Sequence, residues 1–335
     1  MIGINGLGRI GRLAARSLAL QAPGLLGAIN DPAQLGTLVH LLRYDSVHSH
    51  DHLEVSGETQ NGQDFLVIEG QRIPLFHAKE PAEIPWEQGA VTVVVEASGR
   101  FTRRGDAARH LRAGVTHVII SAPSPDPDFT VIFPVNGSEL DLARHRIISN
   151  ASCTAHATAP MLAVLEQAFG LQASTMSTVH VATNDQRLVD APHADLRRAR
   201  AAMVGIHPTT SSAFGALKKA MPWLRDDFDG WALRVPTLSV NLVDLTATVK
   251  QSVSADTLNR AYREAAAGEL KGILAIAEAP LVSCDFTGRE ASVVMDLELT
   301  RVLGGRFLKV FGWHDNEIAY AARLVELVRH IEGRC

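Results

Sequence analysis

A cysteine at the start of an expected helix is the residue of this sequence best placed for covalent chemistry. Cys153 lies in the run NASCTA (150–155), between a short apolar segment (147–149) and a helical pattern (154–169). The partial positive charge at a helix N-terminus lowers the pKa of a thiol, so the position predicts a reactive thiolate. Free cysteines are also often buried as small apolar side chains. Position alone leaves both interpretations open.

The candidate base for such a nucleophile is His180. It lies in the strand-like run TVHV (178–181). A nucleophilic thiol needs a proton acceptor within hydrogen-bond reach, and an imidazole is the usual one. An isolated histidine on a strand can equally be structural, and the spacing of the two residues does not show whether they meet.

A glycine-rich turn near the N-terminus predicts a dinucleotide site. The run Gly6-Leu7-Gly8-Arg9-Ile10-Gly11 follows a short apolar strand and opens a helix. The first glycine allows the tight turn, the second lets the backbone approach a pyrophosphate, and the third lets helix and strand pack closely. Asp31 closes the next strand, where a carboxylate binds ribose hydroxyls and repels the extra phosphate of NADP. A glycine turn with a capping aspartate is the simpler alternative.

The elements around this turn alternate between strands and helices. We expect strands at 25–29, 91–95, 115–121 and 147–149, helices at 9–20 and 103–112, and hairpins at 56–72. This alternation predicts an α/β fold with a Rossmann doubly wound parallel sheet. We assign residues 1–150, joined by a C-terminal helix within 316–335, to an NAD-binding domain.

The pattern changes after residue 150. A helix at 154–169 is followed by strand-like segments at 174–183, 231–250, 281–286, 292–299 and 307–313, and an amphipathic helix is expected at 317–331. Residues 151–315 therefore read as an α+β catalytic domain with a largely antiparallel sheet. The polar run 182–206 lacks periodicity, and loops of that length usually bind a ligand or form an interface.

Composition excludes several classes of protein. A chain of 335 residues is long enough for about two domains. The formal net charge of −4 makes nucleic-acid binding unlikely, and no apolar run approaches the roughly 20 residues that cross a bilayer. Three distant cysteines and an N-terminus without a signal-peptide pattern predict a reducing, cytoplasmic location. No histidine or cysteine spacing predicts a metal site.

Six strings make the sequence resemble one enzyme family, the phosphorylating, NAD-dependent glyceraldehyde-3-phosphate dehydrogenases. They occur in the family's order and span most of the chain. The strings are INGLGRIGR (4–12), SNASCT (149–154), DQRLVD (185–190), DLRRARAA (195–202), LRVPT (233–237) and DNE (315–317).

The resemblance implies a mechanism and an assembly. Cys153 would add to the aldehyde of glyceraldehyde 3-phosphate while His180 accepts the proton. Hydride transfer to NAD would leave a thioester, which inorganic phosphate would convert to 1,3-bisphosphoglycerate. Loop 182–206 would lie at an interface of a homotetramer.

The same resemblance assigns further site residues. Those around the substrate phosphate would be Thr183, Asp185 and Arg234, and those around the attacking phosphate Ser152, Thr154, Arg198, Ser211 and Ser212. The cofactor would also contact Lys79, Ser98, Gly99, Phe101, Ser121, Asn316 and Tyr320. Arginine and hydroxyl donors are the groups that two anionic ligands require.

The sequence departs from the family's pattern in three places. His156 lies where the family usually has an asparagine, and the second cysteine of its Cys-Thr-Thr-Asn-Cys run is absent. Ser211 and Ser212 replace a threonine and a glycine, and Gly215 replaces a lysine. An added side chain at Ser212 changes a position where a glycine amide would meet phosphate. Ile318-Ala319 replaces Trp-Gly, which we interpret as repacking of the last helix.

These departures keep other functions open. Erythrose-4-phosphate dehydrogenase resembles this family but hydrolyses its thioester. A variant dehydrogenase that makes 1-arseno-3-phosphoglycerate from arsenate would suit an altered oxyanion site, and the run 45–48 is similar to that group. A non-catalytic binding protein on the same fold would not need Cys153, His180 and Arg234 together.

Overall fold

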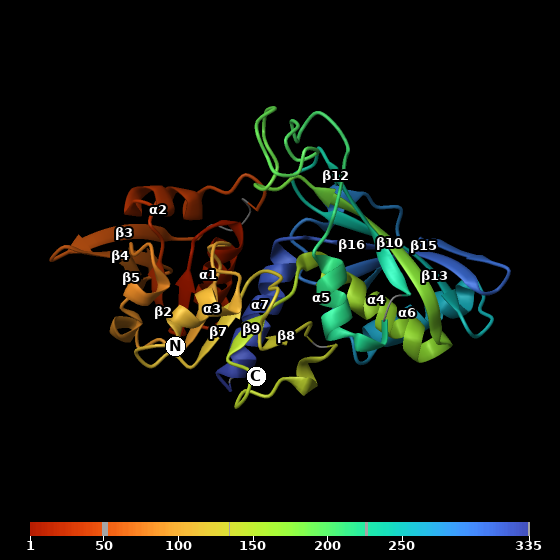
Figure 1. Cartoon of the computed structure of the whole chain (residues 1–335), viewed down its shortest axis with the longest axis horizontal. Coiled ribbons are helices and arrows are strands. Elements are labelled where there is room, and N and C mark those ends of the chain that lie inside the picture. The colour runs from red at the N-terminus through yellow and green to blue at the C-terminus, as the bar shows by residue number, and fades with distance from the viewer. Residues whose placement is uncertain (49–52, 134, 225–226, 334–335) are drawn as a thin grey trace. The chain divides into compact units, whose positions relative to one another are not determined.

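The chain forms two compact units. The computed structural model describes residues 1–48, 53–133, 135–224 and 227–333. Unit 1 contains Met1–Phe133, Gly137–Ala151 and the C-terminal segment from Tyr320, and unit 2 is built mainly from Ser152–Ala319 (Figure 1). Cys335 lies outside the described residues. In the described part of the chain, no helix is long and apolar enough to cross a membrane.

Unit 1 is built on a nine-stranded sheet in the order β3-β4-β5-β2-β1-β6-β7-β9-β8. Neighbours from β5 to β8 are all parallel, while β3 and β4 extend the edge as antiparallel strands. This confirms the predicted Rossmann-type sheet. The strands are β1 (Ile2–Asn5), β2 (Leu26–Asn30), β3 (Val55–Gln60), β4 (Gln63–Ile68), β5 (Gln71–Phe76), β6 (Val93–Glu96), β7 (His117–Ile120), β8 (Phe129–Thr130) and β9 (Ile147–Ser149).

Both faces of this sheet are covered. On β6, Val93 and Val95 belong to one apolar cluster and Val94 to another, as expected for a central parallel strand. The helices of this unit are α1 (Arg9–Gln21), α2 (Leu35–Arg43), the short α3 (Arg104–Ala107) and most of α7 (Ile318–Ile331). Leu324 and Val328 of α7 pack in the same cluster as β1, so the end of the chain completes the core of unit 1.

Unit 2 contains a seven-stranded sheet in the order β11-β12-β10-β13-β16-β15-β14. The β10–β12 and β14–β15 pairs are parallel and the other pairs antiparallel, so the prediction of a largely antiparallel sheet is confirmed. The strands are β10 (Leu171–Val181), β11 (His207–Thr209), β12 (Phe228–Val235), β13 (Asn241–Val249), β14 (Leu274–Ala277), β15 (Val293–Leu303) and β16 (Phe307–His314); the helices are α4 (Cys153–Phe169), α5 (Ala213–Ala220) and α6 (Ala255–Ala267).

Helix α4 packs closely on one face of this sheet. The Thr158 hydroxyl contacts Met176 Sδ of β10 at 3.1 Å. A methyl group added at Gly312 of β16 would lie 2.9 Å from Met161 Sδ, so the missing side chain lets α4 approach the sheet closely. Helix α4 runs antiparallel to β10, because it ends at Phe169 just before that strand begins. The first residue of α4 therefore lies beside the last residues of β10.

Three predicted elements differ from the structure. Residues 281–286 are not a strand: Ser283–Phe286 form a 3₁₀ turn, Val282 is exposed, and the edge strand is β14 instead. The carboxylate of Asp285 accepts a hydrogen bond from the Val282 amide and fixes this turn. Segment 231–250 is two strands, separated by a connection in which Val240 has a φ of 66°. Helix 103–112 is reduced to α3 and one 3₁₀ turn, Ala108–His110.

Loop 182–206 contains no helix or strand, as the sequence predicts. Figure 1 shows it as a long excursion of unit 2 between β10 and β11. Its own polar groups hold it together: Arg200 pairs with Asp190, and the Arg187 guanidinium donates to the Pro192 carbonyl.

Candidate active site

The structure brings the predicted nucleophile and base together. Cys153 is the first residue of α4, and its Sγ lies 3.8 Å from Nε2 of His180 on β10. Ser152 caps the helix by accepting a hydrogen bond from the Ala155 amide, which fixes the first turn. A thiol at this distance can pass its proton to an imidazole nitrogen.

The other ring nitrogen of His180 faces two different partners. Nδ1 lies 2.8 Å from the carbonyl oxygen of Val181 and 2.7 Å from Nη1 of Arg234. A protonated Nδ1 donates to Val181 and leaves Nε2 free to accept the Cys153 proton. An unprotonated Nδ1 accepts from Arg234, and Nε2 then carries the hydrogen. The neighbours of Nδ1 therefore decide whether this ring can act as a base.

Burial reverses the pKa shift predicted for Cys153. Desolvation raises the pKa of the thiol, while the Thr154 hydroxyl, the Arg234 charge and the backbone amides of the first turn lower it by less. The helix N-terminus thus acts in the predicted direction, but its effect is smaller than the cost of burying a thiolate. The prediction of a thiol that ionises easily by itself is wrong.

Burial also lowers the pKa of His180, to about 3, with smaller contributions in the same direction from Arg234 and His314. Both shifts favour the uncharged forms of Cys153 and His180. Transfer of the thiol proton to the imidazole would give two opposite charges that stabilise each other.

Arg234 lies on β12, directly opposite His180 of β10. Its Nη1 also donates to the Val181 carbonyl at 3.1 Å and to the Thr183 hydroxyl at 3.3 Å, while its Nε is buried without a partner among the described residues. Arg234 and Thr183, both predicted at a substrate phosphate, therefore lie side by side.

A second arginine lies in the loop next to this pair. Arg198 forms an ion pair with Asp185, and its guanidinium donates to the Thr209 hydroxyl at 2.9 Å and to the Thr210 carbonyl at 3.2 Å. Asp185, predicted at the substrate phosphate, is thus a partner of Arg198, predicted at the attacking phosphate. The structure links the two predicted anion sites through this ion pair.

Ser211 and Ser212 directly precede helix α5. The Ser211 hydroxyl accepts a hydrogen bond from the Ala213 amide at 3.2 Å. Ser212 is the N-cap residue, is exposed, and makes no side-chain cap hydrogen bond. Hydroxyl groups therefore surround the start of α5, where the family's pattern has a glycine.

The predicted dinucleotide residues of unit 1 follow the carboxyl ends of neighbouring parallel strands. Gly6 follows β1, Asp31 follows β2, Ser98 follows β6 and Ser121 follows β7, so all lie at one edge of the sheet, where such folds bind ligands. Arg9 and Ile10 begin α1, and Lys79 follows the neighbouring parallel strand β5. Gly99 and Phe101 follow Ser98 in the connection after β6.

This edge fits a dinucleotide. Gly6 has a φ of 95°, and a methyl group at Gly11 would lie 1.9 Å from the Gly6 carbonyl oxygen, whereas Gly8 faces open space. The Asp31 carboxylate accepts from the Leu7 amide at 2.7 Å, which fixes a negative charge beside the glycine turn. Room at Gly8 for a pyrophosphate and a fixed carboxylate for ribose hydroxyls are the features that NAD requires.

Two further cofactor candidates belong to different units. Tyr320 lies in unit 1, and its hydroxyl donates to the Ala151 carbonyl at 3.4 Å. Asn316 lies in unit 2, is nearly buried, and its Oδ1 has no partner among the described residues.

Sequence reasoning missed two buried polar residues beside His180. Asn241 begins β13 and His314 ends β16, and both have a solvent exposure of 1% or less. The only available signal was a polar residue at the end of an otherwise apolar strand pattern. His156, whose role the sequence left open, is buried on α4.

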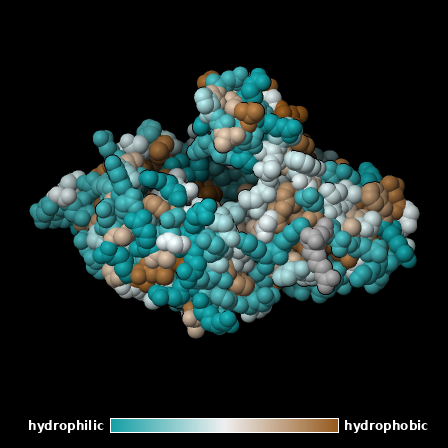
Figure 2. Space-filling view, viewed as in Figure 1, coloured by the Kyte–Doolittle hydropathy of each residue, from teal (hydrophilic) through white to brown (hydrophobic). Residues whose placement is uncertain are grey.

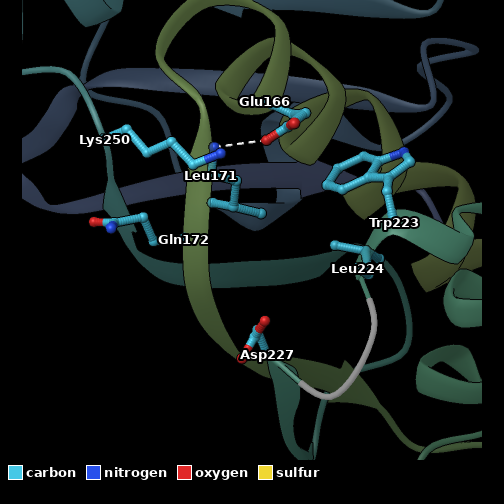
Figure 3. A pocket seen from close by; sticks show the side chains of 7 residues that line it. All are labelled: Glu166, Leu171, Gln172, Trp223, Leu224, Asp227 and Lys250. Atoms are coloured by element: carbon cyan, nitrogen blue, oxygen red, sulfur yellow. Dashed lines mark hydrogen bonds between the residues drawn. The ribbon is translucent and has the colours of Figure 1, made fainter.

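A surface pocket of about 480 Å³ lies elsewhere in unit 2 (Figure 3). Leu171, which lines it, begins β10, whereas His180 lies near the other end of that strand. Charged and aromatic side chains share its wall, and the Leu171 amide donates to Glu166 at 2.7 Å. The pocket is therefore separate from the Cys153 site.

Comparisons with known proteins agree with this arrangement. Residues 1–104 match the NAD binding domain of glyceraldehyde 3-phosphate dehydrogenase, and residues 152–316 match the C-terminal domain of the same enzyme. The chain belongs to the glyceraldehyde-3-phosphate dehydrogenase family. It is therefore confirmed as a member of a family of NAD-dependent oxidoreductases, with NAD as the cofactor of unit 1.

Curated relatives match almost the whole chain. The chain is 46% identical to glyceraldehyde-3-phosphate dehydrogenase of Geobacillus stearothermophilus over 334 residues, which is 99% of this chain and 98% of the relative. It is 44% identical to glyceraldehyde-3-phosphate dehydrogenase 1 of Bacillus cereus over 333 residues, with the same coverage. Identity to glyceraldehyde-3-phosphate dehydrogenase of Streptomyces coelicolor is 43%, over 97% of this chain and 96% of the relative.

Proposed function

We propose that this member of the family oxidises glyceraldehyde 3-phosphate through a thioester on Cys153. The observation that supports this most directly is the 3.8 Å approach of Cys153 Sγ to His180 Nε2, with Arg234 beside them. The relatives' names supply the substrate class, and the geometry supplies a nucleophile, a base and a cation.

The proposed reaction begins at the neutral pair. His180 Nε2 takes the thiol proton as Sγ forms a bond to the aldehyde carbon, and the carbonyl becomes a hemithioacetal hydroxyl group. NAD, when bound, supplies the acceptor for the hydride, and the two electrons removed leave a thioester. His180 gives the proton to the carbonyl oxygen to form the hydroxyl group and takes it back when the hydride leaves. A phosphate oxygen then attacks the thioester and displaces the thiolate to give the acyl phosphate.

Arg234 and Thr183 would bind the phosphate group of the aldehyde substrate. Arg234 is held by Thr183 and by the Val181 carbonyl, so its charge is placed before substrate arrives. A fixed guanidinium forms stronger hydrogen bonds with a phosphate than a neutral donor would. Arg198, Thr154, Ser211 and Ser152 remain the proposed surroundings of the attacking phosphate.

One set of assays tests this function and separates its alternatives. The full chain is incubated with NAD and either glyceraldehyde 3-phosphate or erythrose 4-phosphate, each with phosphate, with arsenate or with neither, and NADH is followed by absorbance. We expect fastest turnover with glyceraldehyde 3-phosphate and a rate that depends on added phosphate. Rates independent of added oxyanion would favour hydrolysis, and a strong preference for arsenate would favour the arsenate-linked variant.

Cys153→Ser provides the matched control. We expect it to abolish turnover while NAD binding, measured by calorimetry, stays largely unchanged, because the predicted NAD residues lie mostly in unit 1. Retained NADH formation in this variant would remove Cys153 from the mechanism. Absence of NADH in the unsubstituted protein, even as a single-turnover burst, would refute the enzymatic function.

We further propose that the protein works as a cytoplasmic homotetramer. Support for assembly comes from the large apolar side chains that loop 182–206 exposes, among them Leu188, Leu196 and Val204. Figure 2 shows hydrophobic residues at the surface of this face of the molecule. A catalytic thiol needs a reducing compartment such as the cytoplasm.

A further inference from the structure

Three buried polar side chains lie at one end of the sheet of unit 2. His180 is the penultimate residue of β10, His314 ends β16, and Asn241 begins β13. Asn241 lies directly opposite His314 in the β13–β16 register. Exposure is 0% for Asn241, 1% for His314 and 8% for His180. Buried polar groups at three adjacent strand ends need hydrogen bonds to one another.

Asn241 already controls the surroundings of His180. Its Oδ1 accepts a hydrogen bond from the Val181 amide at 2.9 Å. The carbonyl of the same residue, Val181, is the acceptor that lies 2.8 Å from His180 Nδ1. Asn241 therefore holds the residue whose carbonyl orients the catalytic ring.

The remaining polar atoms of Asn241 and His314 are complementary. Asn241 Nδ2 and His314 Nε2 are both buried and have no hydrogen-bond partner among the described residues. Directly opposed residues of antiparallel strands have Cβ atoms about 5 Å apart, within reach of an amide and an imidazole. One atom is a donor and the other can accept, and they do not bond each other directly, so one bridging water would satisfy both.

We propose that Asn241 and His314 form a coupled pair that positions His180 for proton transfer from Cys153. One bridging water that accepts from the Asn241 amide and donates to Nε2 of a neutral His314 joins the pair, and this fixes Asn241 while its Oδ1 holds Val181. The inference rests on the proposed role of His180 as proton acceptor. Burial lowers the pKa of His314 to about 3, which keeps a ring nitrogen available as an acceptor at neutral pH.

The pair would act by selecting one tautomer of His180. A fixed Val181 carbonyl favours a proton on Nδ1, and Nε2 then points a lone pair at Cys153. A displaced carbonyl would let Nδ1 accept from Arg234 instead, and Nε2 would lose its basic lone pair. The charged and titratable groups that face His180 are Cys153 from α4, Arg234 from β12 and His314 from β16.

A double-mutant cycle on the full chain tests the pair. The variants are Asn241→Ala, His314→Phe and the double variant, with His314→Gln as a rescue because its amide oxygen can accept from Asn241. Asn259→Ala is the matched control, since it removes a side-chain amide of unit 2 that donates to the Leu297 carbonyl on a different part of the sheet. The readouts are kcat for NADH formation and the pH dependence of Cys153 alkylation by iodoacetamide. Mass spectrometry follows the alkylation, because the exposed Cys284 is a second free thiol.

We expect each single variant to lower kcat roughly ten-fold, as loss of an orienting partner typically does, and to raise the pH midpoint of alkylation by about one unit. The double variant should be no worse than the poorer single variant, and His314→Gln should restore the midpoint. Asn259→Ala should leave the midpoint unchanged. These pH readouts would not respond to a merely structural role.

Additive effects of the two substitutions, or unchanged midpoints in all variants, would overturn the proposal. Alkylation needs neither aldehyde nor NAD, so the pair is tested even if no substrate is turned over. Failure of NADH formation in the unsubstituted protein would instead count against the proposed function.

Discussion

Burial of Cys153 makes its reactivity depend on one neighbour. A thiol whose pKa is raised by desolvation gains little thiolate from the helix N-terminus alone. In the proposed mechanism, proton transfer to His180 is therefore the route to a nucleophile. Because Nδ1 of His180 lies near both Val181 and Arg234, an anion that draws Arg234 away would favour the tautomer that can accept this proton.

The buried histidines of unit 2 predict a loss of stability in acid. Burial lowers the pKa values of His180 and His314 to about 3 in the folded chain, against the ordinary value of 6.5. Between these pH values the unfolded chain binds more protons, so the free energy of unfolding falls as pH drops from 6.5 toward 3. Each group contributes a slope of up to about 1.4 kcal/mol per pH unit. Urea unfolding followed by tryptophan fluorescence at several pH values measures this slope.

Removing one of the two groups should reduce the slope. In His314→Phe, we expect the free energy of unfolding to fall less steeply with decreasing pH. The slope should correspond to about one proton fewer taken up on unfolding. His145→Gln, in unit 1, is the control and should leave the transition of unit 2 as it was. An equal acid slope in His314→Phe would show that His314 is not buried in its neutral form.

At the scale of elements, loop 182–206 exposes several large apolar side chains. Leu196 is 81% and Val204 84% exposed, which is unusual for apolar side chains in a loop held by its own ion pairs. We expect Leu196→Asp and Val204→Asp to shift the proposed tetramer toward smaller species, because buried unpaired charges oppose association. Light scattering after size exclusion measures the mass.

Lys271→Asp, in the turn after α6, is the control for this prediction and should leave the mass unchanged. A chain that is monomeric before any substitution would refute the proposed assembly.

Local patterns determined which elements could be predicted. The glycine turn, α4 and β10 carry their signals in adjacent residues, and all three were predicted close to their observed bounds. Segment 281–286 misled because Leu281 and Val282 are apolar without being buried in a sheet. Asn241 and His314 could not be predicted as neighbours, since their pairing depends on the register of strands far apart in the chain.

The geometry of the candidate site was predictable only in part. The nucleophile, the base and the cation were predicted from residue types and from the family resemblance. They are Cys153, His180 and Arg234. Their distances and the sign of the Cys153 pKa shift required the packing of α4 on β10. Burial depends on elements that the sequence around a residue does not contain.

At the scale of the whole molecule, the two units differ in how they use the chain. Unit 2 is almost one continuous segment, Ser152–Ala319, whereas unit 1 needs the segment from Tyr320 as well. Leu324, Val325, Leu327 and Val328 of α7 lie in the core of unit 1, and the N-terminal amine of Met1 pairs with Glu332. We therefore expect a fragment of residues 152–319 to fold alone, and a fragment of residues 1–151 to fold only with a peptide containing α7.

Circular dichroism of the two fragments, with and without the α7 peptide, measures this. A peptide with Glu332→Gln is the control. It weakens the contacts of Glu332 with Met1 and Thr92 but keeps the apolar face of α7. Cooperative folding of residues 1–151 alone would contradict the expectation.

The shared use of α7 has a consequence for biosynthesis. Residues 1–151 leave the ribosome long before α7 is made, so their apolar surface stays incomplete while all of unit 2 is translated. Most of the NAD-binding unit is translated first, but this unit would be the last to reach its native state. Chaperones that bind nascent chains would then meet this protein mainly through the uncovered face of β1 and its neighbours.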